Sequence, residues 1–209
     1  SAVLGADLIA HGGNPAQRDL LLPGIAAGTT IATLAARDAS GGPLPQAIGP
    51  VLDGGRLTGS AHYVPFGDCA NLLIVAARAG DGIALIALSA DLAGIVTTAQ
   101  TALDATRPLA RIDFDIDVPE EAMLDAAALE PALARAAGLL ASEQLGVAER
   151  SLTETVAYAG ERVQFGRRIG SFQAVKHRLA DMKLAVDEAR SAAAWAAGAI
   201  AGGEDHALA

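Results

Sequence analysis

The sequence has 209 residues, 52% of them hydrophobic and 19% charged, which excludes a chain that is disordered throughout. Its formal net charge of −9 excludes the broad basic surface expected of a general nucleic-acid-binding protein. The single cysteine, Cys69, excludes an intrachain disulfide bond, so we expect a reducing, cytoplasmic location.

Residues 1–23 predict two short helical segments that are separated by the pair Gly12-Gly13, the second ending before Pro23. They contain no basic region followed by an apolar stretch, so the pattern of a secretory signal peptide is absent. We therefore expect the chain to begin partway through a larger helical region.

Residues 24–119 predict a domain of β-strands. Short apolar runs are separated by Gly54-Gly55 and Gly80-Asp81-Gly82, which are typical of β-hairpin turns. The longest apolar stretch, residues 72–96, contains three charged side chains, so we expect no membrane span.

Residues 111–119, RIDFDIDVP, alternate apolar and acidic side chains. This period of two predicts a half-buried strand with its aspartates in solvent, ending at Pro119. Three alternating aspartates can also open a calcium loop, but that loop needs Gly at position six and Glu at position twelve. Val118 and Leu124 stand there instead, so the strand is the better interpretation.

Two long helices are predicted after residue 130. The first begins at Pro131 and runs to about Gly160, with Leu133, Ala137, Leu140 and Val147 along one side. The second follows a cap at Ser171 and carries apolar residues at alternating steps of three and four. These residues are Phe172, Val175, Leu179, Met182, Val186, Ala189, Ala193 and Ala196. Because two helices cannot bury both faces of each other, we expect partner helices elsewhere in the chain or in another subunit.

Common signatures of catalytic and metal sites are missing from the sequence. It contains no dinucleotide-binding, P-loop or hydrolase-elbow pattern and no Cys-x-x-Cys pair. Its four histidines lack the spacing of metal ligands, so no metal site is assigned. We interpret Cys69 as a small core residue.

Residues 161–173, ERVQFGRRIGSFQ, place three arginines and two aromatic residues between the two long helices. The planar guanidinium group binds phosphate oxygens through paired hydrogen bonds, best beside exposed backbone N–H groups at a helix start. Gly166 lets a ligand approach the backbone closely. The segment is either an anion-binding site or a solvated corner, and the residue types alone leave both interpretations open.

The same segment resembles the acyl-CoA dehydrogenase family of flavoenzymes, with the likeness centred on residues 158–190. In that family an Arg-x-x-Phe-Gly elbow, followed by a Phe-Gln or His-Gln pair, joins two helices of a C-terminal four-helix bundle. Its arginine and phenylalanine reach the pyrophosphate region of FAD in a neighbouring subunit, and its glutamine lies near the adenine. The resemblance therefore implies cofactor-binding roles for Arg162, Gln164, Phe165 and Gln173.

A weaker resemblance covers nearly the whole chain. It implies an α+β fold with the end of a helical domain at residues 1–23, a β-barrel-like middle domain at 24–119 and the first part of a C-terminal helical bundle at 120–209. It also implies a homo- or hetero-oligomer, usually a tetramer. The implied reaction oxidises an acyl-CoA thioester to the 2,3-unsaturated acyl-CoA, with FAD as hydride acceptor and electron-transfer flavoprotein as the onward oxidant.

The sequence departs from the family pattern in both flavin loops. Where the family has Thr-Glu-Pro, this chain has Arg37-Asp38-Ala39, and Trp-Ile-Thr is replaced by Tyr63-Val64-Pro65. The changes replace a threonine hydroxyl with a bulky charge and remove one backbone N–H, because proline has none. We therefore expect few hydrogen-bond donors for a flavin ring in this chain's own β-domain.

The family's catalytic glutamate also has no counterpart in the sequence. The family places it either near the end of the chain, beyond residue 209, or in the first bundle helix, where this sequence has Ala136. Glu130 lies more than a helical turn away, so no catalytic residue is assigned. Some bacterial members, including those acting on steroid side-chain thioesters, pair a flavin-bearing subunit with a companion that has lost these features. The resemblance favours that companion role, and the alternative is a scaffold or binding module without flavin chemistry.

Overall fold

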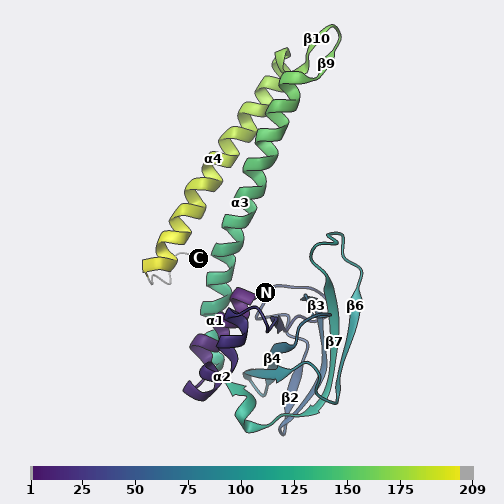
Figure 1. Ribbon diagram of the computed structural model, residues 1–209, viewed down its shortest axis with the longest axis vertical. Coiled ribbons are helices and arrows are strands. Elements are labelled where there is room, and N and C mark those ends of the chain that lie inside the picture. Colours follow the sequence, from purple (N-terminus) through teal and green to yellow (C-terminus); the bar gives the residue numbers. More distant parts are fainter. Residues whose placement is uncertain (1, 203–209) are drawn as a thin grey trace. The chain divides into compact units, whose positions relative to one another are not determined.

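A computed structural model describes residues 2–202, which contain helices and a mixed β-sheet (Figure 1). The described chain divides into two units, the first ending at Leu133 and the second beginning at Ala134. The mixture of a sheet with separate helices confirms the predicted α+β class. The predicted boundaries near residues 23 and 119 stay a prediction.

Two helices open the first unit, α1 (Ala2–Gly12) and α2 (Pro15–Ala26). Asn14 caps α2, because its side chain accepts a hydrogen bond from the backbone N–H of Gln17 and its own N–H donates to the Gln17 side chain. The prediction that this helix ends before Pro23 is wrong, since α2 continues to Ala26. A proline so near the C-terminal end removes only one N–H from the helix, and the last turn still forms.

The first unit contains one eight-stranded mixed sheet. Its strand order is β6-β7-β3-β2-β4-β5-β8, and β1 pairs with β4 beside this path. The strands are β1 (Ala32–Ala35), β2 (Val51–Asp53), β3 (Arg56–Pro65), β4 (Leu72–Ala79), β5 (Gly82–Ser89), β6 (Ile95–Gln100), β7 (Leu109–Asp117) and β8 (Met123–Leu124). Strands β1 and β2 run parallel to β4, and the other pairs are antiparallel.

Glycines make the two hairpin turns that the sequence predicts. Gly54 and Gly55 join β2 to β3 with φ angles of 55° and 85°. Gly80, with a φ of 55°, begins the turn from β4 to β5. Side chains other than glycine are strained in this left-handed region, so the glycines fix the register of both hairpins.

Both faces of β4 are buried. Leu73 and Val75 belong to the core on one side of the sheet, and Leu72 and Ile74 belong to a second core on the other side. The second core also contains Leu8 and Ile9 of α1, so this helix covers that face. A strand that is buried on both faces needs an unbroken apolar run, which explains the sequence LLIVAA at residues 72–77.

Strand β7 has the predicted alternation. Ile112 and Phe114 are buried, whereas Asp115 and Asp117 face solvent and accept hydrogen bonds from Arg56 of β3 at 2.6 and 3.2 Å. The acidic face of the strand is therefore partly neutralised by arginine.

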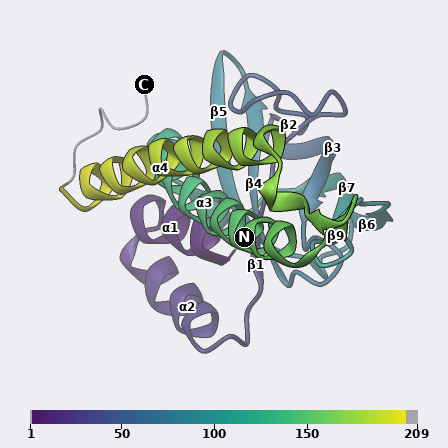
Figure 2. The same cartoon turned by 90° about the horizontal axis from the view of Figure 1, so that it is seen from above.

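The second unit is a pair of long helices joined by a short hairpin. Helix α3 (Leu129–Glu161) begins in the first unit, and α4 (Gln173–Gly202) runs back beside it in both views (Figures 1 and 2). No helix within residues 2–202 is both long enough and apolar enough to cross a membrane. Both ends of α3 and the start of α4 agree with the predicted helices to within about two residues.

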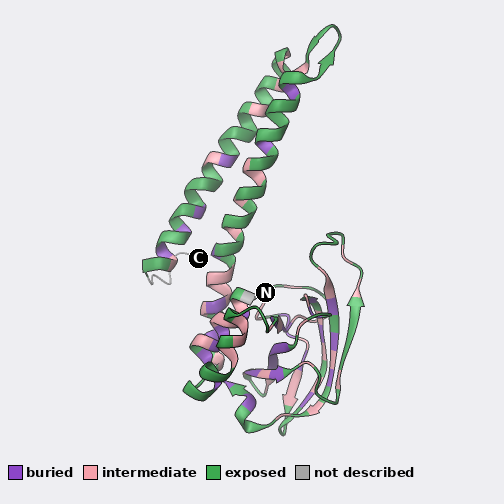
Figure 3. Ribbon diagram, viewed as in Figure 1, coloured by how far each residue is buried: buried purple, intermediate pink, exposed green. Residues whose placement is uncertain are grey.

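The predicted seam of α4 is confirmed in part, since Met182 and Ala189 are exposed. The predicted apolar side of α3 is not the side that meets α4. Val186, Ala193 and Ala196 are buried, and Leu152 and Ala159 are the buried residues of α3 toward its C-terminal end. Leu140 and Val147, which the sequence places along one side of α3, are 46% and 64% exposed. Helix α3 carries more than one apolar stripe, and only one of them meets α4. Exposed residues accordingly dominate this unit (Figure 3).

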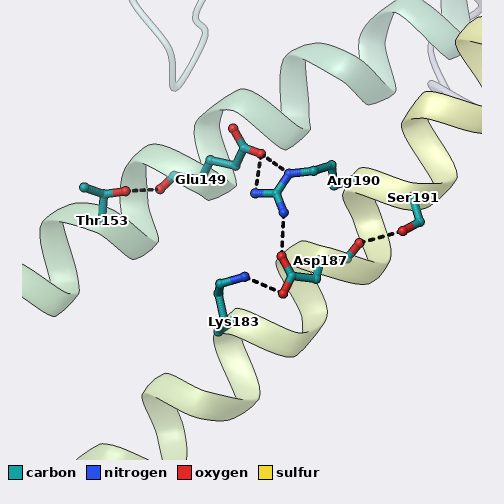
Figure 4. Close-up of polar contacts among 6 residues, drawn as sticks. All are labelled: Glu149, Thr153, Lys183, Asp187, Arg190 and Ser191. Carbon is teal, nitrogen blue, oxygen red and sulfur yellow. Dashed lines mark hydrogen bonds and ion pairs between the residues drawn. The ribbon is translucent and has the colours of Figure 1, made fainter.

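A group of charged residues links the two helices. Arg190 of α4 contacts Glu149 of α3 at 2.7 Å and Asp187 at 2.5 Å, and Lys183 forms an ion pair with Asp187 (Figure 4). These side chains are well exposed, so the group contributes to the register of α3 against α4 more than to stability.

Candidate functional site

The segment between α3 and α4, residues 162–172, is named the tip here. Its centre is a two-residue hairpin in which Gln164 of β9 (Val163–Gln164) pairs with Arg167 of β10 (Arg167–Arg168). Phe165 and Gly166 form the turn with φ angles of 52° and 77°. Two consecutive left-handed residues are the pattern of the hairpin turns that match the twist of a strand pair.

Backbone contacts hold the tip on the ends of the helices. The N–H of Arg162 donates to the carbonyl of Tyr158, and the N–H of Ile169 donates to the carbonyl of Arg162, both at 2.8 Å. A short 3-10 helix (Ile169–Ser171) then leads into α4. The prediction that Ser171 caps α4 is wrong, because its hydroxyl donates back to the carbonyl of Arg168 at 2.7 Å. Phe172 occupies the extended position before the helix instead.

The aromatic residues of the tip are arranged with one arginine. Phe165 is 92% exposed, and its ring meets that of Phe172 edge-on, with centroids 6.2 Å apart and planes at 87°. The guanidinium carbon of Arg167 lies 4.0 Å from the centroid of the Phe172 ring. The tip thus presents an unburied aromatic ring next to a stacked cation.

The four residues with predicted cofactor contacts lie close together along the chain in this structure. Arg162 directly follows the last residue of α3, Gln164 and Phe165 lie in the hairpin, and Gln173 is the first residue of α4. All four are exposed, and Arg162 makes no ion pair within residues 2–202. Their contacts with FAD stay a prediction. Chemically, the arrangement combines a guanidinium free for phosphate with a ring free for a flat organic group.

In the two loops that the family resemblance assigns to the flavin ring, many backbone N–H groups donate to partners within the first unit. Arg37 donates to the carbonyls of Gly41 and Gly42 at 3.1 and 2.5 Å, which turns its guanidinium inward on its own loop. Backbone N–H groups that donate to partners within the unit are those of Asp38, Ser40, Gly41, Gly42, His62, Tyr63 and Phe66. Together with Pro65, which has no N–H, these loops offer few free donors to a flavin ring.

Tyr63 connects the two loops. Its hydroxyl donates to the carbonyl of Ala39 at 3.1 Å, and its N–H donates to the Gln100 side chain at 2.8 Å. A β-carbon added to Gly41 would lie 3.3 Å from the Tyr63 ring, so the ring packs closely over this glycine. The ring therefore covers part of the first loop.

An open cleft of about 410 Å³ lies beside these loops in the first unit. Its polar lining includes Asp38, Gln46, Ser60, His62 and Arg78. The Ser60 hydroxyl is 3.1 Å from Nε2 of His62, and the hydroxyl of Ser40 donates to Asp38 and lowers the pKa of that carboxyl.

The position predicted to correspond to a family glutamate is Ala136, which lies half-buried in α3. Glu130, in the first turn of the same helix, is exposed. Neither residue places a carboxylate where the family has its catalytic glutamate, so no catalytic residue is assigned.

Cys69 is not the core residue that the sequence suggested. It is exposed in the turn between β3 and β4, where its thiol donates to the carbonyl of Phe66 at 3.4 Å. Local desolvation, followed by the neighbouring Asp68 carboxylate, raises the pKa of the Cys69 thiol. A raised pKa keeps the thiol protonated and argues against a reactive cysteine.

Two features of these sites were missed in the sequence. The sequence places Phe172 in the seam and beside Gln173, but it does not reveal that the Phe172 ring contacts Arg167. The bond from Tyr63 to Gln100 joins residues that are 37 positions apart, and no local pattern marks it.

The family model described as "Acyl-CoA dehydrogenase, C-terminal domain" matches residues 126–209. The acyl-CoA dehydrogenase IpdE2 of Mycobacterium tuberculosis is 40% identical over 180 residues, which cover 83% of this chain and 51% of that protein. Among solved structures, a steroid ACAD named Tcur3481-Tcur3483 has a TM-score of 0.84 and 35% identity, covering 96% of this chain and 55% of that one.

A glutaryl-CoA dehydrogenase from Mycobacterium smegmatis has a TM-score of 0.88 and 25% identity, covering 99% of this chain and 57% of that one. The likeness thus includes the sheet and both long helices, although this chain spans about half the length of these relatives. From the matched C-terminal domain, the identity to a named member and the shared fold, we conclude that the chain belongs to the acyl-CoA dehydrogenase family.

Proposed function

We propose that this chain is part of an FAD-dependent acyl-CoA dehydrogenase and acts there as a companion subunit. In this role Arg162, Gln164, Phe165 and Gln173 contact a cofactor that is housed mainly in another subunit. Members of the family are flavoproteins, which supports FAD as the cofactor. When bound, FAD supplies the hydride acceptor for oxidation of an acyl-CoA thioester to its 2,3-unsaturated product.

One contrast within the chain carries the proposal. The tip presents an exposed phenylalanine beside arginines, whereas the two flavin loops of the β-domain have their N–H groups occupied and are linked by Tyr63. The residues present therefore fit the pyrophosphate side of a cofactor and do not fit its ring. In this arrangement the tip binds and orients an anion, and the proton-accepting carboxylate is supplied by another part of the assembly.

The substrate class and partners follow from the likeness. The 35% identity to a structure named as a steroid ACAD favours a CoA thioester of a steroid-derived acid. The two-part name of that structure supports a hetero-oligomer, for which a tetramer is the expected size. Electron-transfer flavoprotein is the proposed onward electron acceptor, and the assembly is proposed to act in the cytoplasm.

Flavin absorbance tests the companion role directly. The full-length protein is purified alone and together with a related acyl-CoA dehydrogenase subunit encoded beside it. We expect flavin absorbance only in the co-purified sample, because the lone chain lacks donors for the ring. Flavin in the lone chain would contradict the companion role, and flavin in neither sample would favour the non-catalytic scaffold.

A further inference from the structure

We propose that Arg167 is a positioning residue that holds Phe165 in place through Phe172. This inference rests on the proposed function of the tip and assigns separate roles to its arginines. Arg162 binds the anion. Arg167 instead contacts an aromatic ring through its charged group and so fixes the shape of the surface that receives the ligand.

Phe165 needs such support because its local geometry is unfavourable. Its φ angle of 52° lies in the left-handed region, which bulky side chains rarely adopt. The residue is 92% exposed, so its side chain gains little from burial. The edge-on contact with Phe172 is the one aromatic contact that orients this ring within residues 2–202. Without it, an exposed side chain on a two-residue turn would be free to exchange rotamers.

Phe172 is held in turn by Arg167. The guanidinium carbon lies 4.0 Å from the ring centroid, well inside the range of a cation–π contact. Arg167 forms no ion pair within the described residues, so its guanidinium group interacts with the Phe172 ring instead. Pairing with Gln164 across the hairpin also restricts the backbone of Arg167. The result is a continuous row of three side chains, Arg167, Phe172 and Phe165.

Arg168 provides a matched comparison. It is the next residue of the same strand, carries the same charge and is equally exposed. Successive side chains of a strand point to opposite faces, so Arg168 lies on the other face from Arg167. It makes no aromatic contact in the described structure. A role for Arg167 that depends only on positive charge would therefore be shared by Arg168, and a positioning role would not.

Fluorine NMR of the full-length chain tests the positioning role without FAD. The protein contains four phenylalanines, so labelling with 4-fluorophenylalanine gives four resonances, and that of Phe165 is assigned with Phe165→Leu. We expect Arg167→Ala to shift the Phe165 and Phe172 resonances and to narrow that of Phe165, whose ring becomes mobile. We expect Arg168→Ala to leave all four unchanged. An unaltered Phe165 resonance in Arg167→Ala would overturn the proposal.

A double-mutant cycle on the assembled, FAD-bearing complex tests the link to binding. Arg167→Ala is expected to raise the Kd for FAD about two- to fivefold, the range of an exposed cation–π contact. In a Phe172→Leu background the same substitution should have no further effect, because its partner ring is gone. An equal loss in both backgrounds would show that Arg167 contacts the ligand directly and would overturn the positioning role.

The two tests separate this inference from the proposed function. If Arg162→Ala leaves FAD retention unchanged, the proposed cofactor contact fails whatever the NMR result. If Arg162→Ala weakens FAD retention but Arg167→Ala leaves the Phe165 resonance unchanged, the cofactor contact stands and the positioning role fails. Thermal unfolding of Phe172→Leu confirms that the variant is folded before either comparison is made.

Discussion

At the scale of single residues, the turn at Phe165-Gly166 places a bulky residue and a glycine in the same left-handed region. The left-handed conformation suits Gly166, but at Phe165 it strains a bulky side chain. Asparagine tolerates this region far better, and Asn-Gly is a favoured pair for such turns. An exposed phenylalanine at this position therefore lowers stability, and the proposed function explains its presence as a ligand contact.

Phe165→Asn should separate stability from function. We expect it to raise the free energy of unfolding by up to about 1 kcal/mol, because part of the backbone strain is removed. The same variant should lose FAD more readily from the assembly, since the ring is gone. Thermal unfolding and flavin retention after gel filtration measure the two effects.

Phe165→Leu is the matched control, because it removes the ring but keeps a bulky side chain in the strained conformation. It should reduce FAD retention without any gain in stability. If Phe165→Asn retained flavin as well as the natural protein, the ring would not be a ligand contact.

At the scale of elements, the tip depends on close packing between its 3-10 helix and the end of α3. A β-carbon added to Gly170 would lie 2.8 Å from the carbonyl oxygen of Ala159 and 3.1 Å from its carbonyl carbon. These are backbone atoms of a helix, which cannot move aside as a flexible side chain can. The glycine therefore sets how closely the tip approaches α3.

Gly170→Ala is expected to destabilise the protein by about 1–3 kcal/mol, the usual cost of overpacking. Gly160→Ala is the control, because a β-carbon at that exposed position of α3 meets nothing within 4 Å. It should stabilise the helix by roughly 0.5–1 kcal/mol. Urea unfolding of both variants checks the prediction, and equal effects would show that the contact of Gly170 with Ala159 is unimportant.

The charged residues between α3 and α4 should make the stability of the protein depend on pH. A hydrogen bond from Lys183, followed by one from Arg190, holds the pKa of Asp187 below its ordinary value of 3.8. A carboxyl whose pKa is lowered by folding contributes stability above its unfolded pKa, and this contribution is lost as the pH falls through its folded pKa. Asp187→Asn should therefore be less stable than the natural protein near neutral pH.

The difference between Asp187→Asn and the natural protein should vanish once the pH falls well below 3.8. Thermal unfolding over a pH series measures it. Asp181→Asn, at an exposed position of the same helix, is the control for the loss of one negative charge from α4. A constant difference across the series would mean that Asp187 stabilises the helices by something other than its charge.

At the scale of the whole molecule, the second unit exposes more apolar surface than two helices alone can cover. Large exposed apolar side chains on α3 and α4 include Leu139, Leu140, Val147, Val156, Leu184 and Trp195. The sequence predicts further helices against these faces, and that stays a prediction. It agrees with the finding that the chain spans about half the length of its relatives.

Local patterns predicted the elements well because their causes are local. Alternation in residues 111–117 identified β7, and glycine pairs identified two hairpins. The side of α3 that packs could not be chosen, because Leu140 and Leu152 fit helical stripes equally well until a partner is known. The exposure of Cys69 depends on where the turn between β3 and β4 lies relative to the sheet, which is a property of the whole fold.

The sequence likewise predicted one part of the candidate site and not another. Sequence likeness identified Arg162 and Phe165 as neighbours in one segment, and the structure places both in the tip. It could not reveal that Arg167 stacks on Phe172 or that Tyr63 bridges two loops. Such contacts depend on rotamers and on residues far apart in the chain, for which a motif carries no information.

The most direct test of the account is flavin retention by the complete assembly with Arg162→Ala in this chain. We expect FAD to dissociate at least about tenfold faster, the scale of a lost charge-assisted hydrogen bond, while each subunit stays folded. Arg150→Ala, which removes an equally exposed arginine of α3 three turns from the tip, should retain FAD like the natural protein. Equal retention in all three proteins would contradict the claim that the tip binds the cofactor of another subunit.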